Sequence, residues 1–186
     1  MENGNRCKMI LIVQIFNEKF HYLEFVKPIE DILKRNEIEF NSIHYKNLEE
    51  KNIKKAEKII ISGTSLKDNK FFDDLSLFNW IKEYNKPILG ICGGMYLLGL
   101  IFGGELKKIQ EIGLTEINFK KEFLGKYGKI EAYDLHNFFV ESDEFEVFGS
   151  SVNCRQAIKH KQKPFYGVLF HPEVRNKDII LNFVNL

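Results

Sequence analysis

The first half of the chain repeats one pattern that restricts its fold: a short strand-like run, mostly apolar and in residues 38–45 alternating, followed by a segment with helical spacing. Such runs are typical of parallel strands that are covered on both faces. Their alternation with helices favours an α/β fold in which a mostly parallel sheet lies between two helical layers. We expect strands over residues 8–15, 38–45, 58–62 and 86–91, and helices over residues 18–36, 47–55, 71–82 and 94–102.

The second half of the chain has a different pattern. Between residues 103 and 166, short alternating or apolar runs are separated by glycine, which indicates antiparallel strands. An apolar strand over residues 165–174 and a closing helix follow. No linker divides the 186 residues, so we expect a single three-layer α/β/α domain over residues 1–186 with an antiparallel C-terminal portion.

Composition excludes several classes of function. The formal net charge is +1, which gives no general attraction to nucleic acid or anionic lipid. No apolar stretch approaches the roughly 20 residues that span a bilayer, and no signal peptide is evident. Cys7, Cys92 and Cys154 are too widely spaced to predict a disulfide framework or a zinc site. We therefore expect a cytoplasmic protein with no membrane or nucleic-acid partner, no cofactor and no metal.

The middle cysteine lies in a glycine-rich turn. Gly90-Ile91-Cys92-Gly93-Gly94 fits the pattern G-x-C-x-G between an expected strand and helix, which is the pattern of a nucleophile elbow. The sharp turn strains the backbone of the central residue, and glycines two positions away avoid collisions. The helix N-terminus favours a thiolate, and the Gly93 N–H would face an oxyanion. The pattern favours Cys92 as a nucleophile; the alternative is a buried cysteine in a glycine turn.

A cysteine nucleophile needs a base and a group that orients the base. The run "VLFHPEV" offers His171 and Glu173, which would face the same way in a strand because they are two residues apart. We expect Glu173 to orient His171 as the base, the alternative being an unrelated surface pair at a strand end. Among the other histidines, His136 in "DLHNFFV" is kept as a candidate site residue.

Two of these stretches, "GICGG" and "GVLFHPEV", resemble the class I, or triad, glutamine amidotransferases. The resemblance spans nearly the whole chain. "KIIISGTS" lies where the family has a strand and an S-G-G-P turn, and "DLHNFF" lies where it has S-H-x-D. The run "AIKHKQKPFYGVLFHPEV" and the closing helix look most like the stand-alone glutamine amidotransferase subunit of archaeal GMP synthetases.

The resemblance implies hydrolysis of glutamine to glutamate and ammonia. Cys92 would attack the side-chain amide, while His171 would protonate the departing ammonia and then activate water. Glu173 would orient His171. The oxyanion would be held by the backbone N–H groups of Gly93 and of the turn Gly63-Thr64.

The resemblance also places a set of residues around the substrate, and some of them depart from the family pattern. Thr64 stands in place of a glycine and would be costly there if that position needs a positive φ. Polar family residues are replaced by Tyr96, Leu135 and Phe138. These changes leave two alternatives open: hydrolysis of another amide, such as a γ-glutamyl compound, or a catalytically silent regulatory role. The expected substrate-binding residues are Gly94, Tyr96, Leu135 and His136.

The ammonia would need an acceptor that is activated elsewhere. The chain has no P-loop pattern and no dinucleotide-binding fingerprint. We therefore expect the partner to be a separate ATP-dependent synthetase subunit, and the resemblance points to GMP synthetase.

Overall fold

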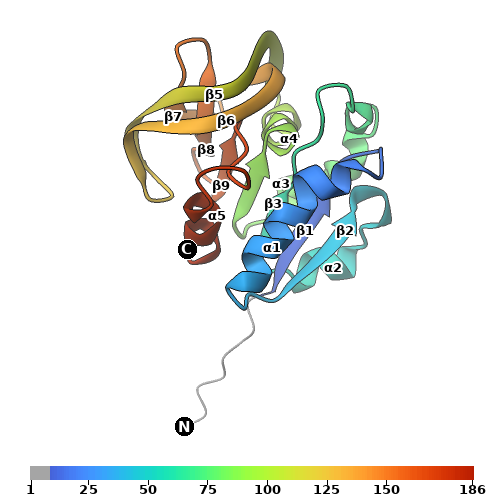
Figure 1. Cartoon of the computed structure of the whole chain (residues 1–186). Coiled ribbons are helices and arrows are strands. Elements are labelled where there is room, and N and C mark those ends of the chain that lie inside the picture. The colour runs from blue at the N-terminus through green and yellow to red at the C-terminus, as the bar shows by residue number, and fades with distance from the viewer. Residues whose placement is uncertain (1–8) are drawn as a thin grey trace.

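The computed structural model describes residues 9–186, in which a mixed sheet of nine strands forms the centre (Figure 1). The strand order is β2-β1-β3-β4-β9-β8-β7-β5-β6. Pairs from β2 through to β9 are parallel, and pairs from β9 through to β6 are antiparallel, so the predicted mixed sheet is confirmed. The strands are β1 (Ile10–Gln14), β2 (Phe40–His44), β3 (Lys58–Ile61), β4 (Ile88–Ile91), β5 (Glu105–Phe123), β6 (Lys126–Glu141), β7 (Phe145–Ser150), β8 (Arg155–His160) and β9 (Phe165–Val168).

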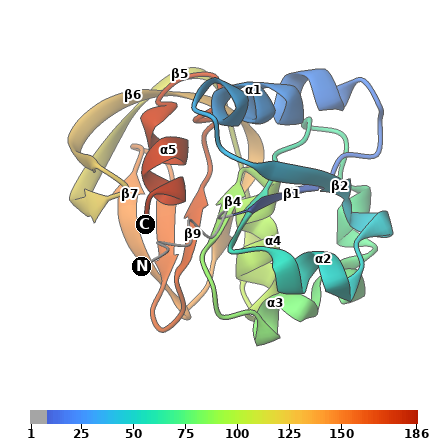
Figure 2. The ribbon, with the colours of Figure 1, turned by 90° about the horizontal axis from the view of Figure 1, so that it is seen from below.

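Helices cover both faces of the sheet, which confirms the three layers. Figure 2 shows α1 and α5 on one face and α2, α3 and α4 on the other. A π-helix, η1 (Tyr22–Val26), leads into α1. No helix of the described residues is long and apolar enough to cross a membrane. The helices are α1 (Lys27–Arg35), α2 (Glu50–Lys55), α3 (Trp80–Glu83), α4 (Gly93–Ile101) and α5 (Asp178–Val184).

The helix expected over residues 71–82 is largely absent. The segment instead forms two 3-10 turns, η3 (Lys70–Phe72) and η4 (Leu75–Phe78), before the short α3. Its buried side chains, Phe71, Phe78 and Ile81, hold the segment against the core. Asp74 accepts a hydrogen bond of 2.5 Å from the Tyr45 hydroxyl. The segment also contains Asp73, Asp74 and Asn79, and aspartate and asparagine favour turns over helix interiors. The residue preferences and the tertiary contacts together outweigh the helical spacing of the apolar residues.

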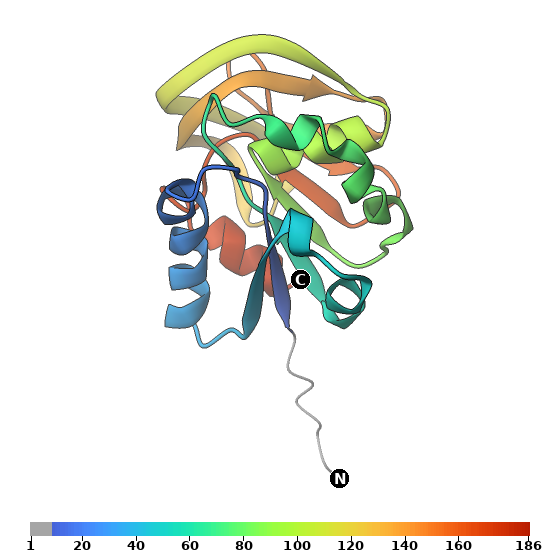
Figure 3. The same ribbon diagram turned by 90° about the vertical axis from the view of Figure 1, so that its right-hand side faces the viewer.

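Strands β5 and β6 form a long antiparallel ribbon that arches over α4 (Figure 3). The ribbon packs closely on that helix, since a Cβ on Gly99 would lie 2.2 Å from Val140 Cγ2. A bulge interrupts the register between Lys108 and Glu111. Bulges bend a strand and change the direction of its side chains. The ribbon thereby places the middle of β6 beside the start of α4, where Cys92 lies.

Candidate active site

The turn between β4 and α4 has the geometry of a nucleophile elbow. Cys92 has φ 48° and ψ −102°, a conformation that costs a non-glycine residue about 1–3 kcal/mol. A Cβ on Gly90 would lie 2.5 Å from the Gly94 carbonyl, and one on Gly94 would lie 2.5 Å from the Ile61 carbonyl oxygen. Both glycines are therefore required sterically, as the sequence pattern predicted.

Strand pairing brings His171 to this turn from 79 positions further along the chain. Strands β4 and β9 are parallel neighbours, and the Cys92 N–H donates to the Val168 carbonyl at 2.7 Å. Three residues later, the His171 N–H donates to the Tyr133 carbonyl of β6 at 2.8 Å. Glu173 Oε1 then lies 2.7 Å from His171 Nδ1, and both side chains are buried. The three residues expected to act together do lie at one site.

The backbone that presents His171 and Glu173 differs from the expectation. Strand β9 ends at Val168, so the prediction of a strand over residues 165–174 was wrong in its second half. The N–H groups of Val174 and Arg175 both turn back to the His171 carbonyl, at 3.2 and 3.3 Å. Pro172 cannot donate to a ladder, and the chain leaves the sheet before it. The turn, rather than the alternation of a strand, brings Glu173 beside His171.

The charge of His171 is set by its neighbours. Burial lowers the pKa of His171, but the Glu173 carboxylate and the Cys92 sulfur together raise it by more, so the pKa lies well above its usual value. An imidazolium at this position favours the thiolate of Cys92. While the proton stays on sulfur, the Cys92 thiol donates instead to the Leu135 carbonyl at 3.6 Å. The ring of Phe25 lies 5.3 Å from that of His171.

The turn after β3 lies against the side chains of both Cys92 and His171. A Cβ on Gly63 would lie 2.8 Å from His171 Cε1 and 3.5 Å from Cys92 Cβ. Thr64 is buried, and its methyl group lies 3.5 Å from the Cβ position of Gly93. Thr64 has no positive φ, so the strain considered for a threonine here does not arise. The two segments that carry the N–H groups expected to hold the oxyanion, Gly63-Thr64 and Gly93, therefore lie next to each other.

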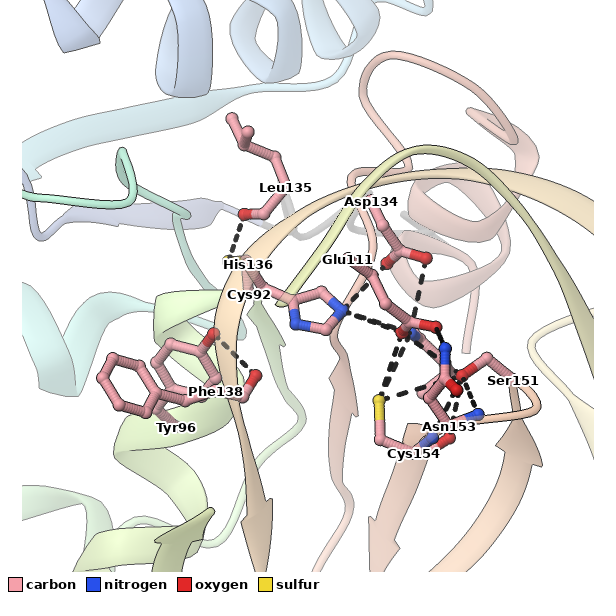
Figure 4. A network of polar contacts seen from close by, with 11 residues as sticks. Cys92, Tyr96, Glu111, Asp134, Leu135, His136, Phe138, Ser151, Asn153 and Cys154 are labelled. Atoms are coloured by element: carbon pink, nitrogen blue, oxygen red, sulfur yellow. Dashed lines mark hydrogen bonds and ion pairs between the residues drawn. The ribbon is translucent and has the colours of Figure 1, made fainter. Parts of the chain in front are cut away.

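The residues expected around the substrate fall into two groups (Figure 4). Tyr96 and Leu135 lie at the site: the Tyr96 hydroxyl donates to the Phe138 carbonyl at 2.9 Å, and Leu135 contributes its carbonyl. Burial raises the pKa of Tyr96, so its hydroxyl stays protonated. Gly94 packs against Ile61. The side chain of His136 points elsewhere, into a separate buried cluster with Glu111.

That buried cluster was not expected from the sequence. It contains Glu111, His136, Cys154 and Gln156, with Asp134 beside them. Burial raises the pKa of the Cys154 thiol to about 12 and that of Asp134 to about 6. The available signal was the spacing of Asp134 and His136, which places them on one face of β6. Their partners come from β5 and β8, so only the sheet order brings the cluster together.

Asp68 connects the loops that follow β1 and β3, next to the site. Its Oδ2 accepts from the N–H groups of Asn17 and Glu18 at 2.7 and 3.1 Å and lies 2.9 Å from His21 Nδ1. Burial raises the pKa of Asp68, but these backbone hydrogen bonds and His21 lower it by more. A carboxylate whose pKa is lower in the folded state stabilises the fold above its unfolded pKa. That contribution is lost as the pH falls through the folded pKa.

We expect Asp68→Asn to lower the free energy of unfolding at pH 7 by about 1–3 kcal/mol, because hydrogen bonds to a charged acceptor are lost. The difference from the unchanged chain should shrink as the pH falls below the folded pKa, where the carboxyl group is protonated in both states. Urea unfolding at a series of pH values measures this. The exposed Asp73→Asn is the matched control and should change stability by less than about 0.5 kcal/mol. Equal losses in both variants would contradict the role of Asp68.

Comparison with known proteins identifies the family. The family model for class-I glutamine amidotransferases matches residues 21–182. A glutamine-hydrolyzing GMP synthase subunit of Pyrococcus abyssi is 36% identical over 140 residues, which are 69% of this chain and 74% of the relative. The corresponding subunit of Pyrococcus furiosus is 34% identical over 151 residues, which are 75% of this chain and 80% of the relative.

Solved structures show the same fold. A Thermoplasma acidophilum protein, assigned provisionally to GMP synthase, superposes with a TM-score of 0.83 and 25% identity, covering 95% of this chain and 92% of that one. A glutamine amidotransferase from Thermotoga maritima has a TM-score of 0.72 with 16% identity, covering 92% and 79%, and this likeness concerns the fold alone. The chain described here belongs to the class I glutamine amidotransferase family.

Proposed function

We propose that this chain hydrolyses glutamine and supplies the ammonia to a separate ATP-dependent synthetase subunit, with GMP synthase as the favoured system. The observation that carries the proposal is Cys92 on a strained elbow beside the buried pair of His171 and Glu173. The similarity to glutamine-hydrolyzing subunits of archaeal GMP synthases supports the choice of partner.

In the proposed reaction, the Cys92 thiolate attacks the amide carbon of glutamine and a C–S bond forms. Collapse of the tetrahedral intermediate breaks the C–N bond, and His171 gives its proton to the departing ammonia. His171 then removes a proton from water, which attacks the thioester and releases glutamate. Glu173 holds the imidazole through Nδ1, and the N–H groups of Gly93 and of Gly63-Thr64 stabilise the oxyanion.

The site described here is closed, which supports activation by a partner. Cys92 is only 3% exposed, and its thiol donates to the Leu135 carbonyl. Glutamine therefore needs some of the surrounding chain to move before it reaches the sulfur. The β5–β6 ribbon carries Leu135, so a partner that shifts this ribbon would both open the site and release the thiol.

A second candidate is hydrolysis of another γ-glutamyl amide. The observation that favours it is the hydrogen bond that the Tyr96 hydroxyl donates to the Phe138 carbonyl. That hydroxyl is then not free to donate to a substrate. Leu135 adds apolar surface where the family has a polar residue, so the site offers fewer polar side chains to the amino-acid end of glutamine.

Labelling of the nucleophile tests the proposal. A diazoketone analogue of glutamine is expected to alkylate Cys92, and mass spectrometry of the digested chain locates the adduct. Labelling should accelerate when the ATP-using subunit of GMP synthase is present with its substrates, together with release of ammonia from glutamine. His171→Ala should suppress both.

The outcomes separate the candidates. Release of ammonia from a γ-glutamyl amide but not from glutamine would favour the second function. If the analogue labels no cysteine and no amide is hydrolysed, with or without the synthetase, both functions are excluded. Labelling that is equally fast with and without the synthetase would retain the hydrolase and reject activation by this partner.

A further inference from the structure

Three strands of the antiparallel half bring a second set of reactive side chains together (Figure 4). Glu111 lies on β5, His136 on β6, and Cys154 directly before β8, and each is more than nine-tenths buried. His136 Nε2 lies 3.2 Å, and Cys154 Sγ 3.3 Å, from Glu111 Oε2. The three atoms all lie within 4.8 Å of one another. The chemistry proposed for Cys92 uses none of these side chains.

Gln156 places its amide nitrogen in the middle of this cluster. Its Nε2 lies 2.7 Å from Glu111 Oε2, 3.3 Å from His136 Nε2 and 3.7 Å from Cys154 Sγ. Asp134 Oδ2 is a fourth neighbour at 3.3 Å. The Cys154 thiol itself donates to Glu111 Oε2, and His136 Nε2 lies within hydrogen-bond distance of the same oxygen. The Gln156 amide nitrogen carries two hydrogens, so it donates to at most two of its four neighbours, and Oε1 is buried without a hydrogen-bond partner among the described residues. Four atoms that can ligate a metal ion therefore surround one amide group whose oxygen is unpaired.

Half a turn about the last side-chain bond of Gln156 would exchange Oε1 for Nε2. The turn costs Oε1 no hydrogen bond but breaks those that Nε2 donates to Glu111 and Asp134, so a bound cation would have to replace them. The oxygen would then face Glu111 Oε2, His136 Nε2 and Cys154 Sγ across the 2.7–3.7 Å now spanned by the nitrogen. Tetrahedral zinc bonds of about 2.0–2.3 Å place neighbouring ligand atoms about 3.3–3.7 Å apart. The separations of 3.2, 3.3, 3.3 and 3.7 Å among these atoms match that spacing, and the 2.7 Å between Gln156 and Glu111 would have to widen by about 0.6 Å. We propose that Glu111, His136, Cys154 and Gln156 form a tetrahedral binding site for a divalent transition metal ion of the zinc type.

The donor atoms select the kind of ion. A thiolate and an imidazole favour zinc and its neighbours, whereas magnesium and calcium take oxygen ligands. When the ion binds, the Cys154 thiol loses its proton to the buffer. The resulting thiolate and the Glu111 carboxylate then balance the two positive charges of the ion. His136 and Gln156 contribute as neutral ligands, and the Asp134 carboxylate lies 3.5 Å from His136 Nε2.

The surroundings suit a structural metal site. Glu111 is oriented from outside by Asn153 Nδ2 at 2.9 Å and Ser151 Oγ at 3.2 Å, in the way that outer partners hold metal ligands. Both belong to the turn between β7 and β8, whose Val152 is 99% exposed, so a turn that faces solvent covers the cluster. The ion would join β5, β6 and β8 directly beside Leu135, whose carbonyl accepts from Cys92.

Cobalt(II) is the probe, because its thiolate complexes have an intense charge-transfer absorption that complexes with only oxygen and nitrogen ligands lack. The full chain carrying Cys7→Ser and Cys92→Ser retains Cys154 as its one cysteine. We expect it to bind one Co²⁺ with this absorption and to lose the absorption when Zn²⁺ is added. Zn²⁺ alone should raise the melting temperature, because it binds the folded state.

Two further variants make the test decisive. Cys154→Ser in the same background should lose the absorption while retaining the circular dichroism of the folded chain. If that variant does not fold, Gln156→Glu serves instead, because its carboxylate supplies an oxygen without the half turn. It should bind Zn²⁺ at least about 10-fold more tightly in competition with a chelating dye. A folded parent without the absorption, a melting temperature that Zn²⁺ leaves unchanged, or unchanged affinity in Gln156→Glu would overturn the proposal.

Discussion

Replacing Cys92 with alanine is expected to lower the rate of glutamine hydrolysis by about 10⁴-fold or more, because the thioester can no longer form. The rate is measured as ammonia released by the chain together with the proposed partner, the ATP-using subunit of GMP synthase. The fold should persist, because the side chain lost is small and alanine keeps the backbone conformation. A variant that retains more than a hundredth of the activity would exclude Cys92 as the nucleophile.

A companion variant tests whether the backbone of the elbow is strained at Cys92. Cys92 has φ 48°, which glycine adopts at little cost and alanine does not. The free energy of unfolding of Cys92→Gly should therefore be about 1 kcal/mol higher than that of Cys92→Ala. Both lack the sulfur, so the comparison isolates the backbone term. Equal stabilities would show that the turn stores no strain at this residue.

Gly94→Ala is expected to lower the free energy of unfolding by about 3 kcal/mol or to prevent folding, because the added methyl has no space. Its Cβ would lie 2.5 Å from the Ile61 carbonyl oxygen and 3.0 Å from the Ile61 Cβ. Ile61 ends β3, which is paired on both sides and cannot move aside. Denaturant unfolding followed by circular dichroism measures the loss.

The neighbouring glycine is the matched control. A Cβ on Gly93 would lie 2.8 Å from Ile15 Cδ1, the flexible end of a side chain, and farther from all else. Gly93→Ala should therefore cost less than about 1 kcal/mol, since alanine also favours the first turn of α4. Similar losses of unfolding free energy in Gly93→Ala and Gly94→Ala would show that the contact with Ile61 does not explain the cost at Gly94.

Local patterns predicted much of the fold and the sharp turn that carries Cys92. The apolar runs correspond to β1, β2, β3 and β4, within a few residues at each end. The steric requirement for glycine around Cys92 is a property of one short turn, so five consecutive residues were enough to predict it. The pairing of His171 with Glu173 was also anticipated, although a turn rather than a strand produces it.

Long-range contacts decided what the patterns missed. The segment over residues 71–82 has apolar residues at helical spacing, yet Tyr45 and the core hold it in 3-10 turns. The three cysteines are too widely spaced to suggest a metal site. Nevertheless, Cys154 lies beside Glu111 and His136, because β7 and β8 fold back onto the ribbon. Similarly, His136 was placed near the substrate by resemblance, but its side chain faces this cluster.

The sequence by itself determined the layered sheet, the elbow and the identity of the groups that would serve Cys92. These follow from periodicity and steric limits that act over a few residues. Only the tertiary structure decided that Cys92 is buried with its thiol on the Leu135 carbonyl, and that side chains from β5, from β6 and from the turn before β8 converge at Gln156. Both depend on the order of the strands and the path of the ribbon, which no local pattern encodes.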